Sequence, residues 1–142
     1  MESSSNTPAL SDPKLPVKLK LSALWTSVMF CYIYADYFEL FKPGRLEGII
    51  AGNGPIGPTT QGGLVIASLV LAIPSVMIFL SIALKATVNR PLNIVFGSLY
   101  TVIIMFTASR NWAFMKMYGV VEVVLTGLVV WYALTWPKQE AD

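Results

Sequence analysis

The sequence contains no histidine and one cysteine, Cys31. Histidine is the commonest metal ligand and the side chain that titrates nearest neutral pH, so proton chemistry would fall to carboxylates, tyrosines or lysines. A lone cysteine cannot form a disulfide or a CxxC redox pair within one chain. The sequence therefore indicates neither a metal site nor a resident cofactor.

Charge is also scarce. The 10 basic and 8 acidic residues make up 13% of the 142 positions, where a soluble domain carries about 25%. Residues 48–84 contain no charge, which a water-exposed surface of that length does not allow. The net charge of +2 is not gathered into a basic patch with interleaved aromatics, which argues against nucleic-acid binding. These features predict an all-α membrane protein whose main partner is the lipid bilayer.

Four stretches are long enough to cross a hydrocarbon core about 30 Å thick, which takes about 20 apolar residues. They predict a four-transmembrane-helix bundle. The predicted parts are a disordered cytoplasmic tail at 1–18, helices at 19–41, 62–84, 91–109 and 117–136, an external loop at 42–61, and a cytoplasmic tail at 137–142. Pro74 should kink the second helix, whereas Pro91 should sit in the first turn of the third.

An even number of spans places both termini on one side of the membrane. Six lysines and arginines fall on the side of the termini and four on the opposite side, counted from the predicted boundaries. The positive-inside rule therefore favours cytoplasmic N and C termini.

Polar residues recur at helical spacing within the spans, and such stripes predict which face of each helix points into the bundle. The stripes are Trp25, Met29, Tyr32, Asp36 and Glu39 in the first span, Asn93, Gly97, Tyr100, Ile104, Thr107 and Asn111 along the third, and Gly119, Glu122, Thr126, Val129 and Ala133 in the fourth. The second span offers the small residues Ser68, Ala72 and Ser75, which suit close helix approach.

Several of these residues should converge near the outer face of the membrane. At 1.5 Å per residue, Asp36 lies about 24 Å beyond Lys20, and Glu122 lies about 9 Å beyond Lys116. The predicted ligand-binding residues are Glu122, Asp36, Glu39, Tyr32, Tyr100, Asn111 and Arg110. No basic residue lies three or four positions from Glu122, which makes this carboxylate the principal candidate.

Two interpretations of the cluster remain open. In the first, the carboxylates pair with Arg110, Lys116 and Arg45 near the headgroups and fix the helix register. In the second, a partly desolvated carboxylate group with tyrosine hydroxyls beside it binds a cation, a proton or a polar headgroup.

Residues outside the spans also raise expectations. The apolar residues Leu46, Ile49, Ile50 and Ile56 of the external loop could dip into the interface, form a lid over the cluster, or belong to a floppy connector. The remaining aromatics are expected to form interfacial belts, namely Trp25, Trp131 and Trp136 on one side and Trp112, Phe114 and Tyr118 on the other.

A resemblance covers most of the chain after the tail. It is carried by the runs 21–25, 31–40, 54–62, 118–122 and 131–133, which include the sequences CYIYADYFEL, GPIGPTTQG and YGVVE. These runs resemble an uncharacterised family of small four-helix bacterial membrane proteins, and more loosely the DoxX-like membrane proteins, some of which associate with redox complexes. The resemblance implies four spans in a bacterial plasma membrane and brings no activity.

Three functions follow as hypotheses. The leading one is a multi-pass protein that binds a small ligand or cation at the outer cluster, for transport or sensing. The second is a non-catalytic subunit or scaffold, as a homo-oligomer or in a larger membrane complex, which docks through Ser68, Ala72 and Ser75. The third is a lipid-modifying enzyme with Glu122 or Asp36 as general acid or base. The sequence lacks the usual ingredients of an active site, so it leans against an enzyme.

Overall fold

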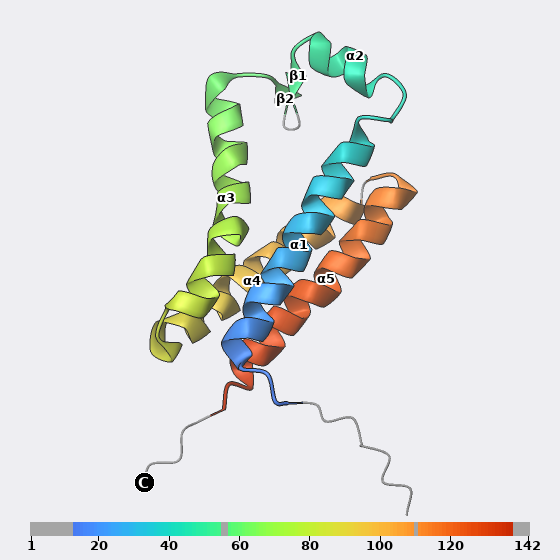
Figure 1. Ribbon diagram of the computed structural model, residues 1–142. Helices are drawn as coiled ribbons and strands as arrows, with labels where there is room; N and C mark the ends of the chain where they lie inside the picture. The colour runs from blue at the N-terminus through green and yellow to red at the C-terminus, as the bar shows by residue number, and fades with distance from the viewer. Residues whose placement is uncertain (1–12, 55–56, 110, 138–142) are drawn as a thin grey trace, which may run out of the picture.

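The computed structural model of the protein describes residues 13–54, 57–109 and 111–137 (Figure 1). In these residues the chain is mostly helical. In chain order its elements are α1 (Val17–Glu39), α2 (Arg45–Ile50), β1 (Asn53–Gly54), β2 (Gly57–Pro58), α3 (Gln61–Ala83), α4 (Ala86–Ser109) and α5 (Ala113–Leu134). We call the end at which α1 begins and α5 ends the base, and the opposite end, which carries α2 and the hairpin β1–β2, the top (Figure 1).

Three of the long helices, α3, α4 and α5, are long and apolar enough to cross a membrane. The prediction that the chain contains helices of membrane-spanning length and apolarity is confirmed for these three. Helix α1 equals α3 in length but carries Lys18, Lys20, Asp36 and Glu39, so composition alone does not identify it as a fourth span. The four-span count and the side of the termini remain predictions.

The helix boundaries differ from the predicted ones, most clearly in α4. This helix begins at Ala86 rather than at Pro91, so Pro91 lies inside it and not in its first turn. Helices α1 and α5 both begin and end earlier than the predicted ranges 19–41 and 117–136.

Parts of the predicted tails fall on residues that the structure does not cover. Residues 1–12 and 138–142 lie outside the described residues. Residues 17 and 18, predicted to belong to the first tail, are the first residues of α1.

Helix α1 packs between α3 and α5, and α4 packs along α5, whereas α3 and α4 approach each other much less. Two glycines permit the close α4–α5 packing. A Cβ at Gly119 would lie 2.5 Å from the Cβ of Ala108, and a Cβ at Gly97 would lie 2.9 Å from the side chain of Val130. Towards the top, α3 stands apart from the other long helices (Figure 1).

The predicted inward faces are confirmed for α5 and largely for α4. The buried residues of α5 are Gly119, Glu122, Thr126, Val129 and Ala133, which is the predicted stripe. Those of α4 are Asn89, Asn93, Gly97, Tyr100 and Ile104. The small residues of these stripes account for part of the agreement, because Gly97 and Gly119 lie where α4 and α5 approach most closely.

The predicted face of α1 is confirmed in part, since Trp25 is buried and Tyr32 is half-buried, and the predicted face of α3 is wrong. Helix α1 buries Leu21, Ser22, Trp25, Val28 and Ala35, and Asp36 is exposed. Since α1 packs against helices on two sides, its apolar residues take the contacts and Asp36 lies beside the gap next to α3. Helix α3 buries Pro74, Met77 and Ser81, and leaves Ser68, Ala72 and Ser75 exposed.

The base contains a buried polar network that joins three helices. The amide oxygen of Asn93 accepts hydrogen bonds from the Trp25 indole N–H, at 2.7 Å, and from the Ser81 hydroxyl, at 3.4 Å. The amide nitrogen of Asn93 donates to Asn89, whose own amide donates to the Ser81 carbonyl at 2.6 Å. Trp25 is fully buried, so its predicted place in an interfacial belt is wrong.

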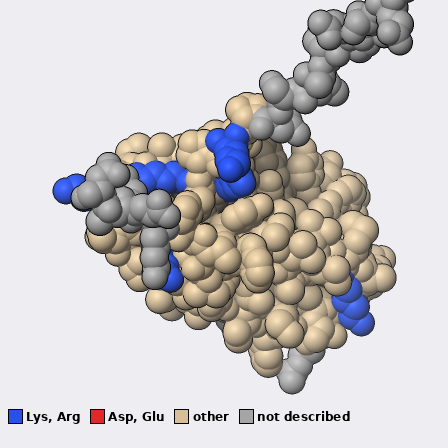
Figure 2. Space-filling view, turned by 90° about the horizontal axis from the view of Figure 1, so that it is seen from below, with Lys and Arg blue, Asp and Glu red and all other residues tan. Residues whose placement is uncertain are grey.

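Basic side chains at the base bind the ends of neighbouring helices. Arg90 donates to the carbonyls of Ala133 and Leu134 at the end of α5, and Lys18 donates to the carbonyl of Ile82 in the last turn of α3. Such carbonyls have no partner within their own helix, and cations there complement the helix dipole. Figure 2 shows basic and no acidic side chains on this face.

Candidate functional site

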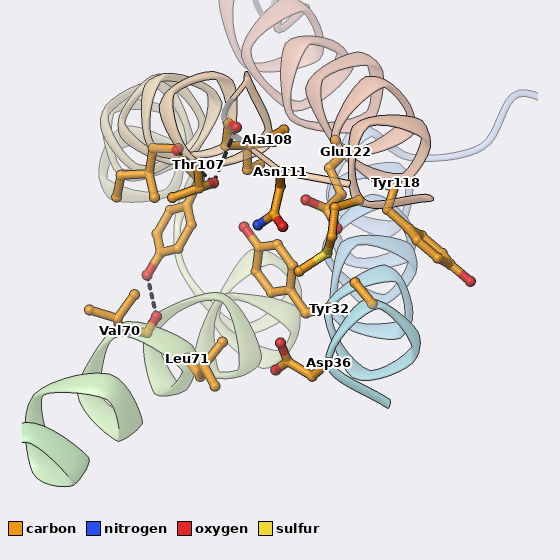
Figure 3. Close-up of a pocket in the computed structure, with 15 residues that line it drawn as sticks. Tyr32, Asp36, Val70, Leu71, Thr107, Ala108, Asn111, Tyr118 and Glu122 are labelled. Carbon is orange, nitrogen blue, oxygen red and sulfur yellow. Dashed lines mark hydrogen bonds between the residues drawn. The ribbon is translucent and has the colours of Figure 1, made fainter. Parts of the chain in front are cut away.

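A cavity of about 270 Å³ lies towards the top, between α1, α3, α4 and α5 (Figure 3). Its walls are mainly apolar, with a few polar groups among them. It is lined by Tyr32, Ala35, Asp36, Val70, Leu71, Tyr100, Ile103, Ile104, Thr107, Ala108, Asn111, Met115, Tyr118, Gly119 and Glu122. Apolar walls with a small number of placed polar groups are typical of sites for small organic molecules.

The structure brings five of the predicted ligand-binding residues together in this cavity: Tyr32, Asp36, Tyr100, Asn111 and Glu122. They come from α1, α4, α5 and the turn between the last two helices. Glu39 does not line the cavity, and Arg110 lies outside the described residues.

Glu122 is the most deeply buried charged residue of the site, with 5% of its surface exposed. Figure 3 shows its carboxylate, the Tyr32 ring and the Asn111 amide turned towards the middle of the cavity. Among residues 13–54, 57–109 and 111–137, no side chain forms a hydrogen bond or ion pair with this carboxylate. A buried carboxylate without a partner is costly for the fold, so its environment is suited to a positively charged or proton-donating group from outside the chain.

Glu39 is in a different situation, because its carboxylate is already paired. Lys42 Nζ lies 2.8 Å from Glu39 Oε1 and also donates to Asn111 Oδ1 at 3.2 Å. Arg45 Nε lies 3.6 Å from the same Glu39 oxygen. The structural interpretation of the carboxylates therefore applies to Glu39, whereas Asp36 and Glu122 form no ion pair with any described residue, Lys116 included.

Tyr100 connects α4 to α3 across the cavity. Proline has no N–H, so Pro74 leaves the carbonyl four residues earlier, that of Val70, without its helical partner. The Tyr100 hydroxyl donates a hydrogen bond to this carbonyl (Figure 3). The side chain of one helix thus replaces the missing backbone donor of another, at a level where α3 and α4 make few other contacts.

A second cavity, of about 480 Å³, lies under α2 and the hairpin. Arg45, Ile49, Asn53, Gly54 and Thr59 form its cover, and α1 and α3 form its sides. Asp36, Val70 and Leu71 line both cavities, so the two adjoin. Helix α2 and the hairpin, which belong to the predicted external loop, therefore line this cavity. The lid, the interfacial segment and the floppy connector stay alternative predictions for the loop.

Not all of the loop's apolar residues take part in this cover. Ile49 lines the second cavity, whereas Leu46 and Ile50 do not and are 52% and 80% exposed. Ile56, also named in the sequence expectation, lies outside the described residues.

Several cavity residues were not predicted from the sequence. Leu71 and Met115 supply apolar wall, Tyr118 belongs to the wall rather than only to a belt, and Thr107 hydrogen-bonds to the carbonyls of its own helix. Only the position of Thr107 on the polar stripe of α4 signalled its place. The role of Tyr100 towards Val70 could have been suspected from Pro74, because a proline inside a helix always frees one carbonyl.

The polar groups of the cavity are joined by aromatic rings. The described residues contain no group of three or more His, Cys, Asp or Glu side chains placed to hold a metal ion. Aromatic rings contribute to the site instead, since the Tyr32 and Tyr100 ring centroids lie 6.5 Å apart and both rings line the cavity.

Comparison with known proteins places the chain without giving it an activity. Searches of curated proteins and of solved structures found no match. The model of one protein family matches residues 15–142, almost the whole chain. The chain therefore belongs to DUF6326, a family of unknown function.

Proposed function

We propose that this chain is a multi-pass membrane protein that binds a small organic ligand in the cavity around Glu122, for transport or sensing. The observation that carries the proposal is the buried Glu122 carboxylate, which faces a mainly apolar cavity and has no partner among the described residues. The adjoining cavity under α2 and the hairpin supports a route to the site from the top, past Asp36.

The proposal includes α1 as a fourth span in a bacterial plasma membrane. The charges of α1 lie near its two ends, and residues 21–35 between them are uncharged. Helix α1 also packs along both α3 and α5, which are apolar enough to span. A membrane-embedded position for α1 is consistent with these contacts.

Both termini are then cytoplasmic. The base carries Lys14, Lys18, Lys20, Lys85 and Arg90, and no acidic side chain is visible on that face in Figure 2. Cytoplasmic ends of membrane proteins are enriched in lysine and arginine. The base also uses some of these residues to bind helix ends, so the bias supports the orientation without requiring it.

Native mass spectrometry of the gently solubilised protein tests the binding function. We expect a small molecule to travel with the wild-type protein. Leu71→Trp should remove it, because Leu71 lines both cavities and the larger ring would fill them. Leu69→Trp is the matched control, since Leu69 lies on the same helix, is 60% exposed and lines neither cavity. Equal occupancy in the two variants would refute the proposal.

A second candidate function is a non-catalytic subunit or scaffold, in a homo-oligomer or in a larger membrane complex of the kind suggested by the DoxX-like resemblance. It is favoured by the exposure of Ser68 and Ala72, whose small side chains permit close approach of another helix. Ser75, the third residue of the predicted docking face, donates instead to Met29 Sδ of α1 at 3.5 Å. Ser68→Leu combined with Ala72→Leu should release a co-purifying subunit. A wild-type protein that is monodisperse and monomeric in mild detergent would contradict this function.

A further inference from the structure

We infer that the ligand of the cavity is a small organic ammonium ion with an apolar body. This inference rests on the proposed function and specifies the chemical class of its ligand. It is carried by the placement of charge, aromatic rings and apolar wall around one cavity, each of which restricts the ligand in a different way.

Charge restricts the ligand to a cation. Asp36 and Glu122 both line the cavity, and neither carboxylate has a partner among the described residues. Of the basic side chains closest in sequence to the α1 carboxylates, Lys42 pairs with Glu39 at 2.8 Å, and Arg45 lies 3.6 Å from Glu39 and lines the adjoining cavity with Asp36. Neither of them lines the cavity around Glu122. Two unpaired carboxylates at one cavity make it favourable for a positive group and unfavourable for an anion.

The aromatic rings indicate which kind of cation fits. Tyr32 and Tyr100 both line the cavity, and their ring centroids lie 6.5 Å apart with planes inclined by 39°. Alkylated ammonium groups bind to aromatic faces through cation–π attraction, and carboxylates complete their neutralisation. A metal ion would instead need several oxygen ligands, for which the described residues provide no group of three acidic side chains.

Volume and wall chemistry restrict the remainder of the ligand. Because a cavity of about 150 Å³ holds a benzene ring, the 270 Å³ found here has room for roughly one ring and a small headgroup. The apolar part of the lining includes Val70, Leu71 and Ile103, which favour an apolar body. Benzyltrimethylammonium has this composition and serves as the probe.

The experiment compares three probes of the same shape by calorimetric titration of the full-length protein in nanodiscs. They are benzyltrimethylammonium, its neutral carbon analogue neopentylbenzene, and the anion benzylsulfonate. We expect the cation to bind at least about tenfold more tightly than the other two. Glu122→Gln should weaken cation binding by about tenfold or more, since a charge-assisted contact is lost, and should change binding of the neutral probe by less than about twofold.

Two control variants locate the effect. Glu47→Gln removes the same charge from the same end of the protein at an exposed position that lines neither cavity, and it should leave cation binding unchanged. Leu71→Trp should abolish binding of any probe that occupies the cavity. Circular dichroism of each variant verifies that it is folded.

The outcomes separate this inference from the proposed function. Cation binding that is lost in both Glu122→Gln and Leu71→Trp supports the two together. Binding that is lost in Leu71→Trp but kept in Glu122→Gln, or a preference for the neutral or anionic probe, overturns the ammonium class and leaves a ligand cavity in place. Failure of all three probes also overturns the ammonium class, and the proposed function is then decided by the co-purifying molecule.

Discussion

Buried polar groups are hydrogen-bonded to one another at the base of the molecule, whereas a buried carboxylate at the top has no partner among the described residues. At the base, Asn93 uses both atoms of its amide, and Trp25 and Ser81 donate to it, so the network is closed upon itself. At the top, Glu122 is buried to a similar degree but has no partner among the described residues. Polar groups that stabilise the fold and polar groups available to a ligand are thus separated along the helices.

The largest effect should come from opening the network at the base. Asn93→Leu leaves the Trp25 indole and the Asn89 amide carbonyl without their partners, and we expect a loss of about 2 to 6 kcal/mol of unfolding free energy, at about 1 to 3 kcal/mol for each of the two unsatisfied groups. Thermal unfolding followed by circular dichroism in detergent measures it. Asn111→Leu, the same change at the top, should cost less than about 1.5 kcal/mol, because Asn111 accepts only from Lys42 and a neighbouring backbone N–H. Equal losses would remove the distinction between the two ends.

A smaller loss of unfolding free energy should show that α4 and α5 pack tightly at the top, so that the open space there lies on the side of α3. Gly119→Leu places a side chain where a Cβ alone would lie 2.5 Å from Ala108, so overpacking of α4 against α5 should cost about 1 to 3 kcal/mol. Gly127→Leu on the same helix is the control, because a Cβ there meets nothing within 4 Å. If both variants unfold at the wild-type temperature, the α4–α5 seam is looser than described.

The smallest expected change in unfolding free energy has the opposite sign, because the protein should be slightly stabilised. Glu122→Gln removes a buried charge that has no described partner, so we expect unfolding free energy at neutral pH to stay the same or to rise by about 1 kcal/mol. Glu39→Gln should instead lower it slightly, by up to about 1 kcal/mol, since it breaks the contacts to Lys42 and Arg45. A marked destabilisation by Glu122→Gln would identify this carboxylate as part of the fold.

The sequence predicted best where the polar and small residues of a helix share one face. The buried residues of α5 follow the predicted stripe from Gly119 to Ala133, because its polar and small residues all face the bundle. Helix α1 lies between two helices, so the position of Asp36 on its surface depended on where α3 packs. Periodicity along one helix contains no information on that arrangement.

The pairing of the carboxylates could not be predicted for a similar reason. Asp36, Glu39 and Glu122 look alike as a list of acidic residues near one end of the spans. What separates them is the position of Lys42 and Arg45, which form ion pairs with Glu39 and none with Asp36 or Glu122 among the described residues. Segment 42–61, which contains both, is too short and too irregular for hydrophobic periodicity to define its fold.

The hydrogen bond between Tyr100 and the Val70 carbonyl makes positions 74 and 100 an epistatic pair. A residue with an N–H at position 74 would donate to the Val70 carbonyl, so the Tyr100 hydroxyl would lose its acceptor. Phenylalanine at position 100 would leave the Val70 carbonyl without a donor only while Pro74 is present. The effect of either substitution therefore depends on the other residue. We therefore expect positions 74 and 100, which are far apart in the chain, to covary among related sequences.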